Sequence, residues 1–212
     1  MPILLILGCY SDGRSAMAFD PRSFQPMVVT DTCAVWNILS ARKLCRAAIT
    51  AKVTFCITPM VLYECVHKPR KAFTLEMVEL LERLRSARAE GVFPIQACDL
   101  DDLLTVSLNA PTRLSSGEIS CIAMAYRMST VAVMTDERLA RRYAEEKLSL
   151  RVETTPRLYG WLHYHRYLSD GDHLEIVAEH EQHERRPLTK FFNEAYEVAL
   201  QYRLMNQSLL SE

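Results

Sequence analysis

Apolar and polar positions follow two distinct rhythms along the chain from residue 27 onward. Short apolar runs, rich in β-branched residues, predict strands at 27–31, 52–58, 92–98, 130–135 and 150–153. Between these runs, apolar residues recur at intervals of three and four, which is typical of helices with one buried face. This second rhythm predicts helices near 33–47, 59–68, 73–88, 99–108, 115–128 and 136–147.

The alternation of strands with helices predicts a parallel sheet covered by helices on both faces. We therefore expect an α/β fold, a three-layer α/β/α sandwich with a central parallel sheet. Residues 1–25 are predicted to form an N-terminal arm, because the segment before the first strand has turn formers and no periodicity. We expect the main domain to span 26–168 and to carry a C-terminal helical extension over 169–212.

The composition is that of a soluble globular protein, with 49% hydrophobic and 24% charged residues among 212. The net charge of -1 gives no overall basic field, so any contact with nucleic acid must use local patches. Seven cysteines without a C-x-x-C pair favour a reducing cytoplasm, and no apolar run is long enough to cross a membrane. The chain has no glycine-rich phosphate-binding motif, which argues against dinucleotide and nucleoside-triphosphate sites.

Four acidic residues are expected at one edge of the sheet. Asp31 and Asp136 each follow a predicted strand, and the carboxyl ends of parallel strands meet at the same edge. Glu64 is the only acid within the predicted helix "PMVLYECV", and Glu118 opens the helix after Ser115. Converging carboxylates repel one another unless a cation neutralises them, and oxygen ligands suit Mg²⁺ or Mn²⁺. Such an ion activates water for phosphodiester hydrolysis.

Each acid also has a structural interpretation. Asp31 and Asp136 are favoured helix N-caps, and Ser115-x-x-Glu118 fits a capping box, in which side chain and backbone bond reciprocally. Glu64 could point into solvent, as most helical glutamates do. The hypothesis of a metal site therefore depends on the four acids occurring together, in one order, on one architecture.

This order resembles the PIN-domain nucleases. The similarity covers roughly 27–165 and rests on "VVTDTCAVWNIL", "ITPMVLYECV" and "LSSGEISCIAMAYRMSTVAVMTDERLARRYAEE". The resemblance implies an α/β/α sandwich with Mg²⁺- or Mn²⁺-dependent ribonuclease activity, and homodimers are frequent in the family. Many members are toxins of bacterial toxin–antitoxin pairs, each inhibited by a partner antitoxin protein. By this resemblance Asp31, Glu64, Glu118 and Asp136 are the catalytic and metal-binding residues, with Glu137 as an additional acid.

Basic residues near these acids are candidates for contacts with RNA phosphates. We predict Lys68, Arg138 and Arg141 as substrate-binding residues, although helix ends are commonly basic without any such role. The sequence thus predicts a cytoplasmic, metal-dependent endoribonuclease, either a toxin of a toxin–antitoxin pair or a stand-alone enzyme. The alternative is a catalytically silent PIN-like module that binds RNA or a protein partner.

Overall fold

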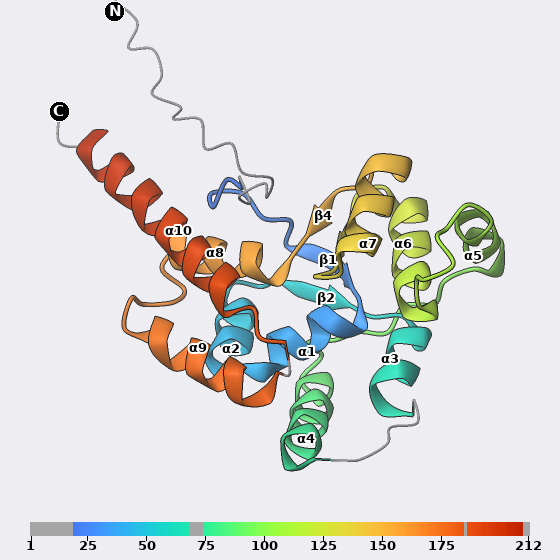
Figure 1. Cartoon of the computed structure of the whole chain (residues 1–212), viewed down its shortest axis with the longest axis horizontal. Coiled ribbons are helices and arrows are strands. Elements are labelled where there is room, and N and C mark those ends of the chain that lie inside the picture. The colour runs from blue at the N-terminus through green and yellow to red at the C-terminus, as the bar shows by residue number, and fades with distance from the viewer. Residues whose placement is uncertain (1–18, 68–73, 185, 210–212) are drawn as a thin grey trace, which may run out of the picture.

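The computed structural model describes residues 19–67, 74–184 and 186–209 (Figure 1). Its strands are β1 (Met27–Thr30), β2 (Thr54–Cys56), β3 (Ala132–Met134) and β4 (Val152–Glu153). They pair in the order β2-β1-β3-β4, and every pairing between them is parallel. The predicted α/β/α architecture with a central parallel sheet is confirmed.

Helices flank this sheet in two groups. The first contains α1 (Thr32–Ser40), α2 (Arg42–Thr50), α4 (Leu75–Ala89), α8 (Thr155–Tyr164), α9 (Asp172–His183) and α10 (Thr189–Leu209). The second contains α3 (Pro59–Val66), α5 (Leu100–Ser107), α6 (Ser116–Met128), α7 (Arg138–Arg142) and the π-helix η1 (Tyr143–Lys147). Figure 1 shows the strands between these groups. Within the described ranges, no helix has the length and apolar character needed to cross a membrane.

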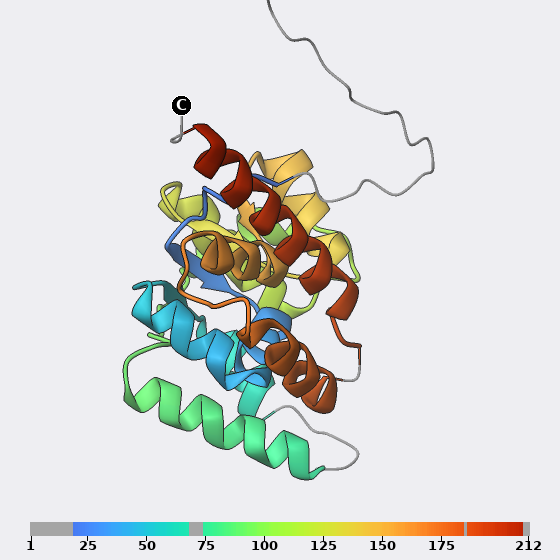
Figure 2. The ribbon, with the colours of Figure 1, turned by 90° about the vertical axis from the view of Figure 1, so that its left-hand side faces the viewer.

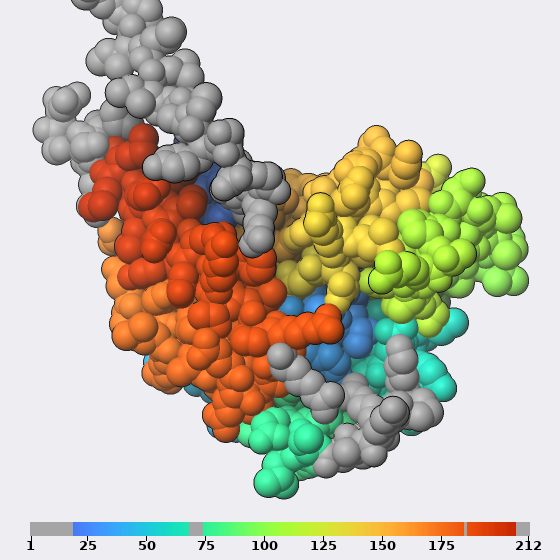
Figure 3. Space-filling view, in the orientation of Figure 1, coloured from blue at the N-terminus to red at the C-terminus, as the bar shows by residue number. Residues whose placement is uncertain are grey.

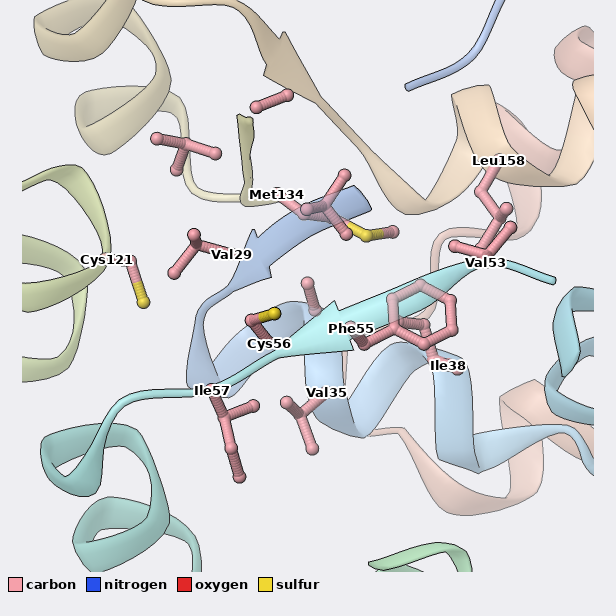
Figure 4. Packing of buried hydrophobic residues seen from close by; sticks show 14 of the residues in the cluster. Val29, Val35, Ile38, Val53, Phe55, Cys56, Ile57, Cys121, Met134 and Leu158 are labelled. Atoms are coloured by element: carbon pink, nitrogen blue, oxygen red, sulfur yellow. The ribbon is translucent and has the colours of Figure 1, made fainter. Parts of the chain in front are cut away.

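Strand β1 lies at the centre of the sheet and is buried. Val28 and Val29 are fully inaccessible to solvent, and Val29 pairs with Cys56 on one side and Val133 on the other. Figure 4 shows apolar side chains from β1, β2, β3, α1 and α6 meeting around these strands. Because β1 is central, the residue that follows it lies at the middle of the carboxyl edge of the sheet.

Local sequence signals explain where several helices begin. The hydroxyl of Thr58 accepts a hydrogen bond from the N–H of Val61, and Pro59 occupies the first turn of α3. Helix α6 begins with the predicted capping box, in which the Ser115 hydroxyl accepts from the Glu118 N–H and the Glu118 carboxylate accepts from the Ser115 N–H. These caps satisfy backbone donors that would otherwise lack partners.

Three predicted elements differ in the structure. The helix expected over 33–47 is broken at Ala41, which has extended backbone angles and separates α1 from α2. The strand expected over 92–98 is reduced to one bridge between Ile57 and Ile95, since Pro94 has no N–H to donate. The helix expected over 136–147 begins two residues later and continues as η1.

The terminal segments pack against the main domain. Phe192, Ala195 and Ala199 of α10 are buried, while Phe191 is 41% exposed. Figure 2 shows α10 running beside α8 and α9. Phe19 and Phe24 are also buried, so the described end of the predicted N-terminal arm, 19–25, is part of the packed structure.

Candidate active site

Asp31 occupies the connection between β1 and α1 and is only 1% exposed. Its Oδ1 accepts a hydrogen bond of 2.8 Å from the N–H of Ala34, so the residue is the N-cap of α1. Its Oδ2 is buried and has no hydrogen-bond partner among the described residues. Burial raises the pKa of this carboxyl to about 8. The Ala34 N–H and the nearby Thr135 hydroxyl oppose the shift, and the charges of Asp136 and Glu118 add to it. One oxygen thus caps the helix while the other is available to a ligand.

Glu64 projects inward from α3 and is 6% exposed, so the solvent-facing alternative is wrong. Its Oε2 accepts from the Thr32 hydroxyl at 2.7 Å. Its Oε1 accepts from the Ser116 hydroxyl at 3.1 Å and from the Gly117 N–H at 2.9 Å. A Cβ at position 117 would lie 2.8 Å from Glu64 Oε2, so only glycine lets the carboxylate approach the start of α6 this closely.

Glu118 combines the two interpretations that its sequence context allowed. Its Oε2 accepts from the Ser115 N–H at 2.6 Å, which completes the capping box. The same side chain lines a pocket with Asp31 and Glu64. Burial raises the pKa of Glu118, and the charges of Glu137 and Glu64 raise it further.

Asp136 follows β3 but does not cap the next helix, whose N-cap residue is Glu137. Its Oδ2 accepts from the Asn37 amide at 2.7 Å and from the Thr155 hydroxyl at 2.6 Å. Its Oδ1 accepts from the Thr155 N–H at 2.8 Å. Burial raises the pKa of Asp136 as well, although these hydrogen bonds oppose the shift. Asp136 is therefore anchored to α1 and to the start of α8.

A pocket of about 360 Å³ brings three of the four predicted acids together. It is lined by Asp31, Thr32, Cys33, Glu64, Arg113, Ser115, Glu118 and Glu137. Asp136 is not among the lining residues, but it is close enough for its charge to raise the pKa of Asp31. Figure 3 shows the blue surface around α1 at the floor of a hollow between the yellow, orange and teal parts of the chain.

The donor set fits a hard divalent cation with several bound waters. Across the ranges that the structure covers, no three His, Cys, Asp or Glu side chains are arranged as a ready metal site. Glu64 and Asp136 use both carboxylate oxygens on protein donors, and Glu118 uses one. Mg²⁺ commonly binds through only one or two carboxylates and keeps its waters. The unpartnered, buried Oδ2 of Asp31 is the atom best placed for direct coordination.

Several residues around the acids were not singled out by the sequence. Asn37 and Thr155 orient Asp136, and Arg113 lies at the rim of the acidic pocket. Glu184 follows α9, and burial together with the charge of Asp136 raises its pKa to about 7. None of them belongs to a motif that the sequence analysis used. Thr155, at the start of α8, and Glu184, at the end of α9, reach the site from far along the chain.

The predicted phosphate-binding residues have different outcomes. Lys68 lies outside the described residues. Arg138 is exposed and lines a second pocket next to the acidic one. Arg141 lies near Asp136, where its positive charge lowers the pKa of that carboxyl.

Buried carboxylates at the carboxyl edge of a parallel sheet, between two layers of helices, define an α/β/α domain with an acidic pocket. A family model described as DUF3368, a PIN domain, matches residues 27–182. The chain therefore belongs to the PIN-domain family, which has a nuclease-type fold and generally depends on divalent metal. No curated protein matches the sequence significantly.

Proposed function

We propose that the protein is a divalent-metal-dependent endoribonuclease that hydrolyses RNA phosphodiester bonds. The observation that carries this proposal is the Oδ2 of Asp31, a buried and unpartnered carboxylate oxygen in a pocket with Glu64 and Glu118. An isolated buried charge is costly, and a bound cation would remove that cost. The family membership supports the same chemistry.

The four acids would have different roles toward the ion. Asp31 would hold Mg²⁺ or Mn²⁺ directly, while Glu64, Glu118 and Asp136 would hold it directly or through water. When bound, the ion would supply an activated water and stabilise charge on the phosphate oxygens. The Thr32 hydroxyl and the Gly117 N–H each donate a hydrogen bond to the Glu64 carboxylate. These two bonds hold the carboxylate in one position. The toxin role, the antitoxin partner and the homodimer stay predictions from the family resemblance.

The test compares wild type with Asp31→Asn on labelled single-stranded RNA, with Mn²⁺ or with EDTA. Asparagine keeps the N-cap but removes the charge that the ion needs. We expect cleavage by wild type only with Mn²⁺, and a loss of at least about 100-fold in the variant, since one such charge stabilises the transition state by several kcal/mol. Asp101→Asn, an exposed position in the first turn of α5, makes the same chemical change away from the pocket and should cleave normally.

Thermal unfolding provides a readout that is independent of activity. The pKa of Asp31 is higher in the folded state than the ordinary value near 4, so its ionisation destabilises the metal-free fold as pH rises from about 4 to 8. At pH 8 the metal-free Asp31→Asn protein should therefore be more stable than wild type, while Mn²⁺ should raise the unfolding temperature of wild type alone. Equal cleavage by both proteins, or an equal Mn²⁺ effect on both, would sink the proposal.

A further inference from the structure

A second pocket adjoins the acidic one. Its volume is about 410 Å³, and it is lined by Arg113, Leu114, Glu118, Glu137, Arg138, Leu139 and Arg142. Arg113, Glu118 and Glu137 line both pockets, so the two are direct neighbours. A chain molecule bound at the acids could therefore extend past these shared residues into the second pocket.

Two arginines of this second pocket are available to a ligand. Arg113 and Arg138 are exposed, and neither makes a hydrogen bond or ion pair with the described part of the chain. Arg142 differs, because its guanidinium pairs with Glu146 at 3.1 Å one helical turn away. A guanidinium presents paired N–H donors that match the oxygens of a phosphate. The pocket thus has the donors for at least one phosphate beside the acidic site.

Two leucines also line this pocket. Leu139 on α7 is 38% exposed, and Leu114 contributes a more buried side chain before α6. Among the described residues, neither pocket is lined by an aromatic side chain that could stack on a base. A base could instead rest on the leucines and against the flat face of a guanidinium, which requires that the base be unpaired.

We propose that the second pocket binds one nucleotide of a single-stranded RNA next to the bond that is cut. Arg113 and Arg138 hold its phosphate, and Leu114 and Leu139 contact its base. This assignment rests on the proposed function, because it takes RNA as the substrate of the acidic site. It adds a binding site for one nucleotide beside the acids and names the residues that form it.

Binding can be measured separately from cleavage. A fluorescently labelled single-stranded RNA decamer is titrated with the full chain in EDTA, and anisotropy is recorded at several salt concentrations. Arg113→Ala and Arg138→Ala should each weaken binding by about 3- to 10-fold and reduce the salt slope by about 0.7, the value for one phosphate contact on a single strand. Leu139→Ser should weaken binding with an unchanged salt slope, and thermal unfolding shows that each variant is folded.

Arg88→Ala is the matched control. It removes one exposed arginine from the last turn of α4 and should leave binding unchanged. Equal weakening by Arg88→Ala, or equal competition by duplex RNA of the same sequence, would overturn the subsite. Normal binding by Arg113→Ala and Arg138→Ala would also overturn it while leaving the nuclease intact. Tight RNA binding by a wild type that never cleaves with Mn²⁺ would instead reject the proposed function.

Discussion

At the scale of single residues, the acids of this pocket show why local patterns allow two interpretations. Asp31 caps α1 with one oxygen and leaves the other unpartnered in the described structure, so capping and ligand binding use different atoms of one side chain. Glu118 likewise completes a capping box and lines the pocket. A sequence motif can therefore show that an acid is suited to cap a helix, but it does not show whether the second carboxylate oxygen is available to a ligand.

Gly117 gives a prediction at this scale. Alanine within a helix is usually more stable than glycine by about 1 kcal/mol. In Gly117→Ala, however, the added Cβ would lie 2.8 Å from Glu64 Oε2 and would displace that carboxylate. We expect RNA cleavage and Mn²⁺ affinity to fall by about tenfold or more, as a displaced ligand typically costs, while urea unfolding shows little loss of stability.

Gly171→Ala is the control for this substitution, because its Cβ would meet only the Ser169 hydroxyl at an ordinary 3.8 Å. Unchanged cleavage and metal affinity in Gly117→Ala would show that the position of Glu64 does not matter for the reaction.

At the scale of helices and strands, the sequence predicts the elements whose signals are local. The buried strand at 27–31, the proline start of α3 and the capping box of α6 all depend on neighbouring residues, and all are present. The break at Ala41 depends instead on Arg83, whose guanidinium donates to the carbonyls of Leu39 and Ser40 from another helix. The anchoring of Asp136 by Thr155 is equally non-local. Contacts between residues far apart in the chain produce no periodic pattern in the sequence, so the sequence does not predict them.

The helices α8 to α10 bury histidines, which predicts a pH dependence of stability. His163 and His180 are fully buried, and burial lowers the pKa of each to about 4. The unfolded imidazoles, with pKa near 6.5, bind protons first, so the unfolding free energy falls as pH drops from about 6.5 to 4. At most, each histidine accounts for about 3 kcal/mol of this loss. Urea unfolding between pH 4.5 and 7.5 measures it.

The two histidines should respond differently to substitution. His163 has no hydrogen-bond partner in the described structure and lies edge-on to Tyr159 and Tyr196, so His163→Phe should keep neutral-pH stability and lessen the acid loss. His180 bonds the Ser40 hydroxyl at 2.6 Å and the Leu188 N–H at 2.8 Å. His180→Phe should therefore lose about 2 kcal/mol at neutral pH, and the difference from wild type should shrink as pH falls toward 4, because the variant has no buried imidazole at this position. An unchanged acid dependence in His163→Phe would contradict this account.

At the scale of the whole molecule, the C-terminal helices belong to the same core as the sheet. Ile176 of α9 and Phe192 of α10 are buried in the hydrophobic cluster that also contains Val28 of β1. The family match covers residues 27–182, which includes nearly all of α9. The site at the N-terminus of α1 is thus supported by a helix that packs, at its other end, on the C-terminal part of the chain.

Arg83 makes this connection and is the basis of the last prediction. Its side chain is 11% exposed and donates to the α1 carbonyls at 2.8 and 2.9 Å and to the carboxylates of Glu79 and Glu179 at 2.7 and 2.8 Å. Arg83→Met would leave the two α1 carbonyls without this donor and would remove a cation from Glu79 and Glu179, which keep their contacts with Arg42. We therefore expect a loss of about 2 to 3 kcal/mol in unfolding free energy. Arg85→Met changes an exposed arginine of the same helix and should stay within about 0.5 kcal/mol of wild type.

Because the lost bonds hold the end of α1 opposite Asp31, Arg83→Met should also weaken Mn²⁺ binding at temperatures where it is still folded. Full stability in Arg83→Met would show that the C-terminal helices stay in place without this arginine, and that the pocket does not depend on it.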